Sequence, residues 1–221
     1  MDKKIISFCL WGDNPKYTIG AIKNANLTNE IYSGWISRFY CGKSVPDDII
    51  NQLKSIDNCE VVLMDENGNW NGMFWRFLPA SECDVSIMIS RDCDSRLSIR
   101  EKLAVDEWLN SDKNFHIMRD HPCHGIEILG GMWGVKYPLL KDMKTYINDY
   151  NKGNFWQVDQ LFLKSIIYPI VKDDIYVHDE FFVFNKNTNN FPSNREGLMF
   201  VGEIFDENDN PIISHRNMLK K

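Results

Sequence analysis

The first 64 residues of the chain alternate between short apolar runs and stretches of helical character. The runs at 4–10, 35–40 and 59–64 have the length of buried strands, and segments 17–30 and 46–56 carry apolar residues at helical spacing. Strands that alternate with helices form a mainly parallel sheet with helices on both faces. The sequence therefore predicts an α/β fold with a Rossmann-like sheet.

A fourth apolar run, 85–89, ends in two acids, Asp92 and Asp94, that one residue separates. An apolar run without alternation is typical of a central strand, and open α/β folds bind ligands at the carboxyl ends of such strands. Alternate residues of an extended chain point the same way, so both carboxylates can reach one Mg²⁺ or Mn²⁺ ion. The alternative is a strand end that is capped by solvated charges.

Composition excludes several classes of function. The 221 residues carry a formal net charge of −6, which argues against a general nucleic-acid-binding protein. The six cysteines show no metal-binding spacing and indicate a reducing compartment. The apolar N-terminal stretch is too short for a secretory signal, and no stretch has the length of a membrane span. We expect a cytoplasmic protein of one domain.

The rest of the chain continues the pattern. We expect helices at 73–79, 98–109, 137–150 and 156–167, and strands at 115–118 and 175–177. Ser98 with Glu101 forms a capping box at the start of the second of these helices.

Three further segments are candidate site residues, each with a simpler reading beside it. Residues 8–12 end the first strand and can hold a nucleotide base through their backbone, or form an ordinary turn. Arg76 lies among aromatic residues, where it either contacts a phosphate or the acidic loop, or pairs with a structural acid. Segment 130–134, Gly-Gly-Met-Trp-Gly, permits backbone approach to a ligand and stacking of an indole on a sugar, or forms a tight bend.

Titratable groups in the second half add to the candidates. Asp159 and Gln160 lie at the start of an apolar helix, as a cap or as a pair directed into the crevice. His121 shares a polar loop with His124 and can touch a substrate. His178 follows a strand and precedes two acids, so it is either a third metal ligand or a satisfied surface histidine.

Taken together, these segments resemble the metal-dependent glycosyltransferases of the GT-A fold, and within them a small group of microbial and viral sugar transferases. The resemblance extends to about Gly202 and lies in Phe-Trp-Arg-Phe-Leu-Pro (74–79), Ser-Arg-Asp-Cys-Asp-Ser-Arg (90–96), Arg-Asp-His-Pro (119–122), Gly-Gly-Met-Trp-Gly (130–134), Val-Asp-Gln-Leu-Phe-Leu (158–163) and Val-His-Asp (177–179). The chain departs from larger members in having no separate acceptor domain, and Lys220 follows His215 only at a distance.

The resemblance implies that the two halves of the single domain, 1–221, have different roles. Residues 1–97 would bind the nucleotide and end with the acid pair, and residues 98–221 would supply the acceptor and catalytic side chains and an irregular tail. Asp92 and Asp94 would hold Mn²⁺ or Mg²⁺, with His178 as third ligand and His215 as the alternative. The donor-binding residues would be Phe8, Cys9, Leu10, Trp11, Arg76, Arg91, Asp92, Cys93 and Asp94.

The implied activity is transfer of a sugar from a nucleotide-sugar, a UDP-sugar, to a glycan or another hydroxyl acceptor. Asp159 and Gln160 would be catalytic, and the sugar and acceptor would meet His121, Gly130, Gly131, Met132 and Trp133. A viral source would place the enzyme in the host cytoplasm. Two alternatives remain: a nucleotidyltransferase acting on a sugar phosphate, and a non-catalytic carbohydrate-binding domain that uses the aromatic residues alone.

Overall fold

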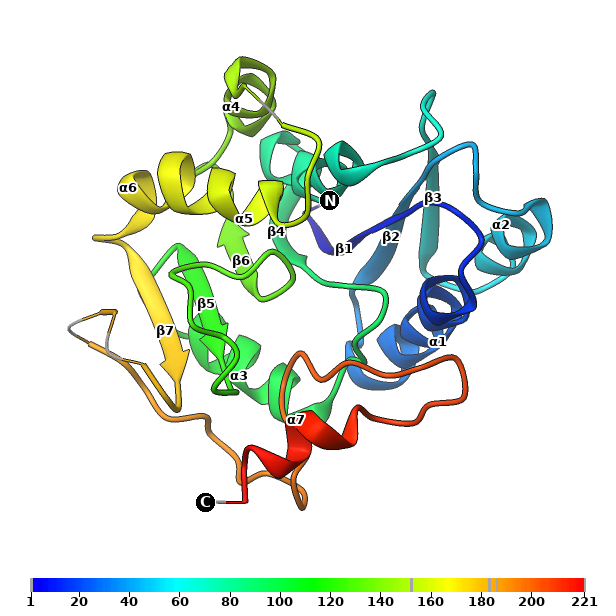
Figure 1. The fold of residues 1–221 in the computed structure, drawn as a ribbon. Coiled ribbons are helices and arrows are strands. Elements are labelled where there is room, and N and C mark those ends of the chain that lie inside the picture. The colour runs from blue at the N-terminus through cyan, green and yellow to red at the C-terminus, as the bar shows by residue number, and fades with distance from the viewer. Residues whose placement is uncertain (1, 152, 183, 186, 221) are drawn as a thin grey trace.

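A computed structural model describes residues 2–151, 153–182, 184–185 and 187–220. Its centre is a seven-stranded mixed sheet in the order β3-β2-β1-β4-β6-β5-β7 (Figure 1). The strands are β1 (Lys3–Leu10), β2 (Ile36–Cys41), β3 (Cys59–Leu63), β4 (Val85–Ser90), β5 (Phe115–Arg119), β6 (Trp133–Lys136) and β7 (Ile175–Asp179).

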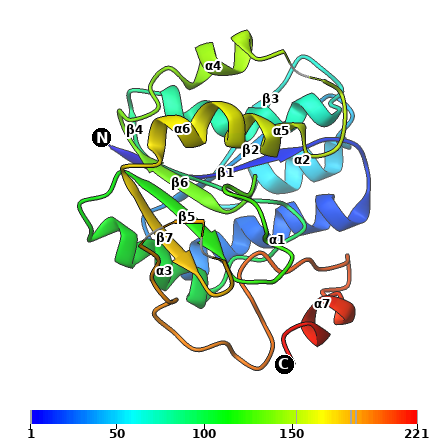
Figure 2. The same ribbon diagram turned by 60° about the vertical axis from the view of Figure 1, so that its left-hand side comes forward.

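Helical segments cover both faces of the sheet (Figure 2). One apolar cluster lies between the sheet and α1–α3, and a second lies between the sheet and η1, α4, α5 and α6. The segments are α1 (Pro15–Ile31), α2 (Asp47–Lys54), the 3₁₀ helix η1 (Trp70–Ser81), α3 (Ile99–Leu109), α4 (Met143–Asp149), α5 (Val158–Phe162), the π-helical η2 (Leu163–Ile167), α6 (Tyr168–Val171) and α7 (Ile213–Asn217).

The sheet is parallel except at β6. β1 pairs in parallel with β2 and β4, whereas β6 pairs antiparallel with both β4 and β5. The carboxyl ends of β1, β2, β4 and β5 therefore lie at one edge. The chain order reverses between β1 and β4, and a reversal of this kind leaves a crevice at that edge in open α/β sheets.

The predicted fold class, a mixed and mainly parallel α/β sheet, is confirmed. Half of the predicted capping box is present: the Ser98 hydroxyl accepts a hydrogen bond from the Glu101 amide at 3.2 Å, whereas the Glu101 carboxylate accepts from Tyr32 and Arg91. Two further details differ from expectation. The helix predicted at 137–150 begins only at Met143, and the segment from Trp133 to Lys136 is a strand that we did not expect.

The C-terminal segment returns to the acid pair. The Phe205 amide donates to the Asp94 carbonyl at 2.8 Å, and Ile204 forms an isolated bridge with Ser95. In Figure 1 this segment, in orange and red, runs below the carboxyl edge of the sheet to α7. In the described part of the chain, no helix has the length and apolar character that a bilayer crossing needs.

Candidate active site

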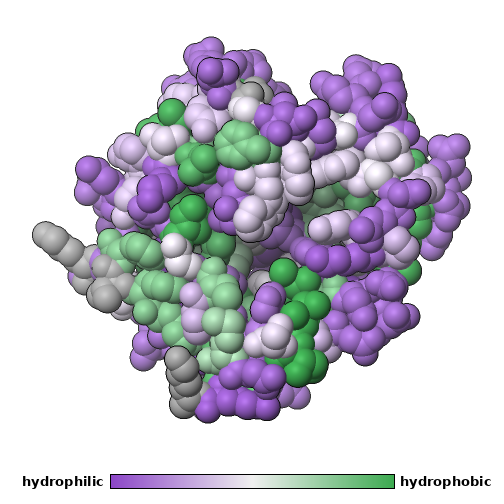
Figure 3. All heavy atoms as spheres, viewed as in Figure 1, coloured by the Kyte–Doolittle hydropathy of each residue, from purple (hydrophilic) through white to green (hydrophobic). Residues whose placement is uncertain are grey.

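The acid pair follows β4 directly, at the edge where the sheet order reverses. The Asp92 side chain is 42% exposed and that of Asp94 is 14% exposed. Figure 3 shows this face hollowed near its centre, between the start of α5 and the C-terminal segment, with hydrophilic residues at the floor. The pair therefore lies where a ligand of an open α/β sheet is expected to bind.

Each acid of the pair is bonded to a cation of the protein itself. The Arg76 guanidinium donates through Nη1 to Asp92 and through Nη2 to Asp159, the latter at 2.7 Å. On the other side, Lys16 Nζ lies 2.7 Å from Asp94 Oδ2. Arg76 is 1% exposed and Asp159 is fully buried, whereas the Lys16 side chain is 28% exposed. The site thus contains three carboxylates and two cations in two bonded sets, Asp92–Arg76–Asp159 and Asp94–Lys16.

The carboxylates of this group perturb one another. Burial raises the pKa of Asp94, and the nearby charge of Asp92 raises it further, although the hydrogen bond from Lys16 opposes both effects. Burial also raises the pKa of Asp159, against the opposing charge of Arg76. A group that lowers the energy of two crowded carboxylates by adding positive charge would be favoured at such a site.

The close packing of these charged side chains explains why residues 130 and 131 are glycines. An ideal Cβ on Gly131 would lie 2.0 Å from Asp92 Oδ2, and one on Gly130 would lie 2.4 Å from both Arg76 Nη2 and Asp159 Oδ2. We expected close approach of this backbone to a ligand. The structure shows close approach to the charged side chains of the site instead, so any larger residue would displace them.

Replacing Gly131 with alanine should therefore disturb Asp92 without changing the sheet. We expect the Mn²⁺ affinity of the Gly131→Ala variant, measured by electron paramagnetic resonance, to fall about tenfold as the carboxylate is pushed from its position. Gly125→Ala is the matched control, because the nearest atom to its Cβ would lie at an ordinary 3.4 Å. Equal Mn²⁺ affinities in the two variants would contradict this account of Gly131.

The acid pair fits a divalent ion. Its carboxylate oxygens are the hard ligands that Mg²⁺ and Mn²⁺ prefer, and Asp92 is open to solvent. Within the described ranges, no three His, Cys, Asp or Glu side chains gather as a metal cage. Mg²⁺ typically binds through one or two carboxylates and the phosphate oxygens of a substrate, so a pair of acids is a sufficient protein contribution.

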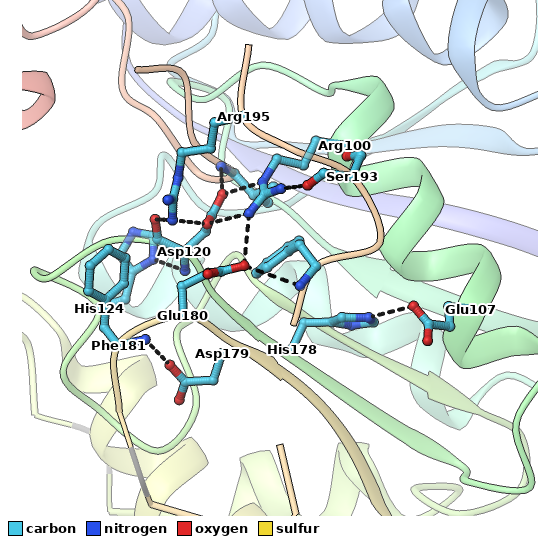
Figure 4. A network of polar contacts seen from close by, with 12 residues as sticks. Arg100, Glu107, Asp120, His124, His178, Asp179, Glu180, Phe181, Ser193 and Arg195 are labelled. Atoms are coloured by element: carbon cyan, nitrogen blue, oxygen red, sulfur yellow. Dashed lines mark hydrogen bonds and ion pairs between the residues drawn. The ribbon is translucent and has the colours of Figure 1, made fainter. Parts of the chain in front are cut away.

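His178 does not join the acid pair, contrary to expectation. Its Nδ1 lies 2.8 Å from His116 Nε2, and its Nε2 lies 3.2 Å from Glu107 on α3 (Figure 4). β7 is the third strand from β4 in the sheet order, a separation of about 14 Å at the usual strand spacing. His178 is fully buried there, so the structure shows a hydrogen-bonded core histidine.

A second network of polar contacts fixes the tail near this strand. Arg100 and Arg195 both pair with the fully buried Asp120 at the end of β5, and Arg100 also pairs with Glu180 (Figure 4). Arg100, Glu180 and Arg195 border a cavity of about 360 Å³ that does not include the acid pair. The network ties α3, β5 and the segment around residue 195 together, and its charges balance internally.

Several predicted ligand contacts are core residues instead. The Trp133 indole is fully buried and stacks on Phe115 at a centroid distance of 5.3 Å, so it offers no face to a sugar. Arg91 is 2% exposed and pairs with Glu101 on α3 at 2.7 Å, away from the acid pair. The predicted residues whose side chains belong to the apolar clusters are Phe8, Leu10, Cys93, Met132 and Trp133.

The other predicted contacts lie closer to the crevice. Cys9 is 9% exposed, and burial raises the pKa of its thiol to about 12, so it stays neutral. Trp11 is half-buried and packs edge-on against Trp75 at 6.4 Å. His121 is 1% exposed, and its Nε2 lies 3.0 Å from the His215 carbonyl oxygen, so it holds the C-terminal segment. Gln160 is partly exposed at the start of α5.

Sequence reasoning missed Lys16, although the signal was present. Asn14 caps α1 by accepting from the Lys16 amide at 3.0 Å, and Pro15 occupies the first turn. An Asn-Pro pair after a strand marks a helix start, and the first helical turn after β1 lies beside the end of β4 in a sheet of this order. The cap and the topology together would have placed Lys16 at the acid pair.

No family model matches the sequence, and no curated protein matches it significantly. Solved structures do match it. A glycosyltransferase involved in glycosylation of the major capsid of the virus PBCV-1 superposes with a TM-score of 0.54 at 19% identity, covering 80% of this chain and 81% of that one. The chain has the GT-A fold. At this identity the match shows the fold alone.

Two further GT-A matches differ in chemistry. Glucosyl-3-phosphoglycerate synthase from Mycobacterium tuberculosis, in complex with Mn²⁺, uridine-diphosphate-glucose and phosphoglyceric acid, matches with a TM-score of 0.52 at 14% identity, over 80% of this chain and 69% of that one. The 4-diphosphocytidyl-2C-methyl-D-erythritol synthase from Anaerococcus prevotii matches with a TM-score of 0.51 at 11% identity, over 80% and 87%. The GT-A fold of this chain is thus shared by glycosyl and nucleotidyl transferases.

Proposed function

We propose that the protein is a metal-dependent glycosyltransferase that moves a sugar from a UDP-sugar to a hydroxyl of a glycan or a small acceptor. The observation that carries the proposal is the acid pair at the switch point of the sheet, with Asp92 open to solvent and with Arg76 and Lys16 bonded to the pair. The fold shared with a transferase that binds Mn²⁺ and uridine-diphosphate-glucose supports the proposal.

The charges of the site suit departure of a nucleoside diphosphate. Cleavage of the bond from the anomeric carbon to the phosphate oxygen leaves negative charge on the diphosphate. Asp92 and Asp94 would hold Mn²⁺ or Mg²⁺, which supplies Lewis-acid stabilisation of that charge. Arg76 adds fixed positive charge beside the same place, where preorganised charge contributes most to lowering the barrier, and Lys16 adds a second positive charge there.

The catalytic roles of Asp159 and Gln160 remain a prediction. In this conformation Asp159 is fully buried and bonded to Arg76, so its contribution is to position that guanidinium. Gln160 is the partly exposed member of the pair, and its amide can donate to a sugar hydroxyl. In this buried position the Asp159 carboxylate does not face an acceptor hydroxyl.

A nucleotidyltransferase is the second candidate, because a cytidylyl-transferring enzyme shares the fold. In such an enzyme the acceptor would attack a phosphorus atom rather than the anomeric carbon, and the leaving group would be pyrophosphate rather than a nucleoside diphosphate. A carbohydrate-binding domain is less well supported, since Trp133, the aromatic residue expected to stack on a sugar, is buried.

A panel of nucleotide-sugars with Mn²⁺ tests the proposal. At a hundred times its dissociation constant, the correct donor should stabilise the fold by about 2.7 kcal/mol. For a chain of this size that is a rise in Tm of roughly 5–10 °C. EDTA should abolish the rise, and turnover with acceptor should release the nucleoside diphosphate. In a second assay with a nucleoside triphosphate and a sugar phosphate in place of the nucleotide-sugar, release of pyrophosphate would support the second candidate. A rise in Tm that resists EDTA would contradict the metal requirement.

A further inference from the structure

Lys16 lies where its ammonium group can bond either Asp94 or an anion bound beside it. Its Nζ lies 2.7 Å from Asp94 Oδ2, while its stem begins in the first turn of α1, the helix that follows β1. The Asp94 side chain is only 14% exposed, so this ion pair is partly withdrawn from water and stronger than an exposed pair. A cation bonded to Asp94 occupies part of the coordination space that a divalent ion would need.

We propose that Lys16 is the exchangeable counter-ion of the donor site: it neutralises Asp94 in the metal-free protein and transfers its hydrogen bonds to the donor diphosphate when a divalent ion binds Asp94. The inference rests on the proposed function and deepens it. It identifies Lys16, from α1, as a diphosphate-binding residue, whereas the lysine that the sequence suggested for that role, Lys220, lies in the C-terminal tail.

The chemistry of lysine suits the exchange. An ammonium is a point charge with three donors on a flexible stem, so it can leave one oxygen for another at small cost. Arg76 lacks this freedom, because its guanidinium is buried and bonded to Asp159 as well as Asp92. Once a divalent ion neutralises Asp94, the nearest uncompensated anion available to Lys16 is the diphosphate. Lys16 should therefore weaken metal binding when no nucleotide is present, and strengthen nucleotide binding when the metal is bound.

Removal of Lys16 should therefore change the affinity for metal and the affinity for nucleotide in opposite directions, and this difference is the test. Mn²⁺ binding is measured without nucleotide by electron paramagnetic resonance, and UDP binding is measured calorimetrically at saturating Mn²⁺. In Lys16→Met we expect Mn²⁺ affinity to rise about threefold to tenfold, and UDP affinity to fall about tenfold, as for loss of a charge-assisted hydrogen bond. Lys16→Arg should restore most of the UDP affinity because it keeps the charge.

Lys23→Met is the matched control. Lys23 lies two turns further along α1, in a more exposed ion pair with Asp209, and neither affinity should change in that variant. Unchanged affinities in Lys16→Met, or a fall in both, would overturn the inference and leave the proposed function standing. If the unmodified protein shows no Mn²⁺-dependent UDP binding, the inference and the proposed function fail together.

Discussion

Asp94→Asn should reduce sugar transfer about a thousandfold, the loss expected when positioned charge at a transition state is removed. Asparagine keeps the shape of the side chain but lacks the charge that binds a divalent ion, and it releases Lys16. Initial rates of nucleoside diphosphate release at saturating Mn²⁺ measure the effect. Asp92→Asn should behave similarly, since Asp92 is the more exposed member of the pair.

The fold of Asp94→Asn should remain intact, which separates this result from unfolding. Burial raises the pKa of Asp94, so the ionised carboxylate costs stability above its folded pKa, and a neutral amide removes that cost. We expect Tm at neutral pH to be unchanged or higher. Asp84→Asn is the control, because Asp84 pairs with Lys3 before β4 begins, at the opposite end of the strand. Full activity in both Asp92→Asn and Asp94→Asn would rule out the proposed function.

Arg76→Met should cost the most stability of any single change at the site. The substitution leaves the fully buried Asp159 carboxylate without its counter-ion, and Oδ1 of Asp159 already has no hydrogen-bond partner among the described residues. Breaking a buried pair by removing one partner typically costs about 3–5 kcal/mol. For a domain of this size, that is a fall in Tm of about 10 °C, measured by calorimetry.

The double variant Arg76→Met/Asp159→Leu distinguishes an uncompensated charge from lost packing. Replacing both ions with apolar groups removes the desolvated carboxylate, so much of the lost Tm should return. Arg38→Met provides a comparison, because Arg38 is also buried but pairs with Glu60 and Glu82, which retain access to water. A double variant as unstable as Arg76→Met alone would show that the guanidinium matters through its packing.

Much of the sheet could be predicted because its first strands are recognisable from their own sequences. β1, β2 and β3 are apolar runs separated by helices, and that alternation alone determines a parallel arrangement. β6 was not predictable in this way. It is a short strand that begins at Trp133, two residues after Gly131, and its place between β4 and β5 depends on long-range pairing that no local pattern encodes.

The acid pair could be predicted from its place after β4, but its partners could not be assigned from spacing. In the sequence His178 resembles Asp92 in lying near the end of an apolar run, yet it belongs to β7, the third strand from β4 in the sheet order. Arg91 and Arg76 are both arginines near the pair, and only Arg76 points to it, because Arg91 turns toward α3. Polar residues at strand ends indicate which edge is functional, whereas the direction of each side chain depends on tertiary packing.

The contact between Phe205 and the Asp94 carbonyl has a consequence for how the protein is made. As a ribosome synthesises the chain, β1 to β4 and the acid-pair loop emerge early and can begin to fold. The last backbone partner of that loop is more than a hundred residues downstream, so this contact cannot form until residue 205 has emerged. A nascent chain shorter than that would carry the acid pair without the contact, and the proposed donor site would be complete only after residue 205 has been made.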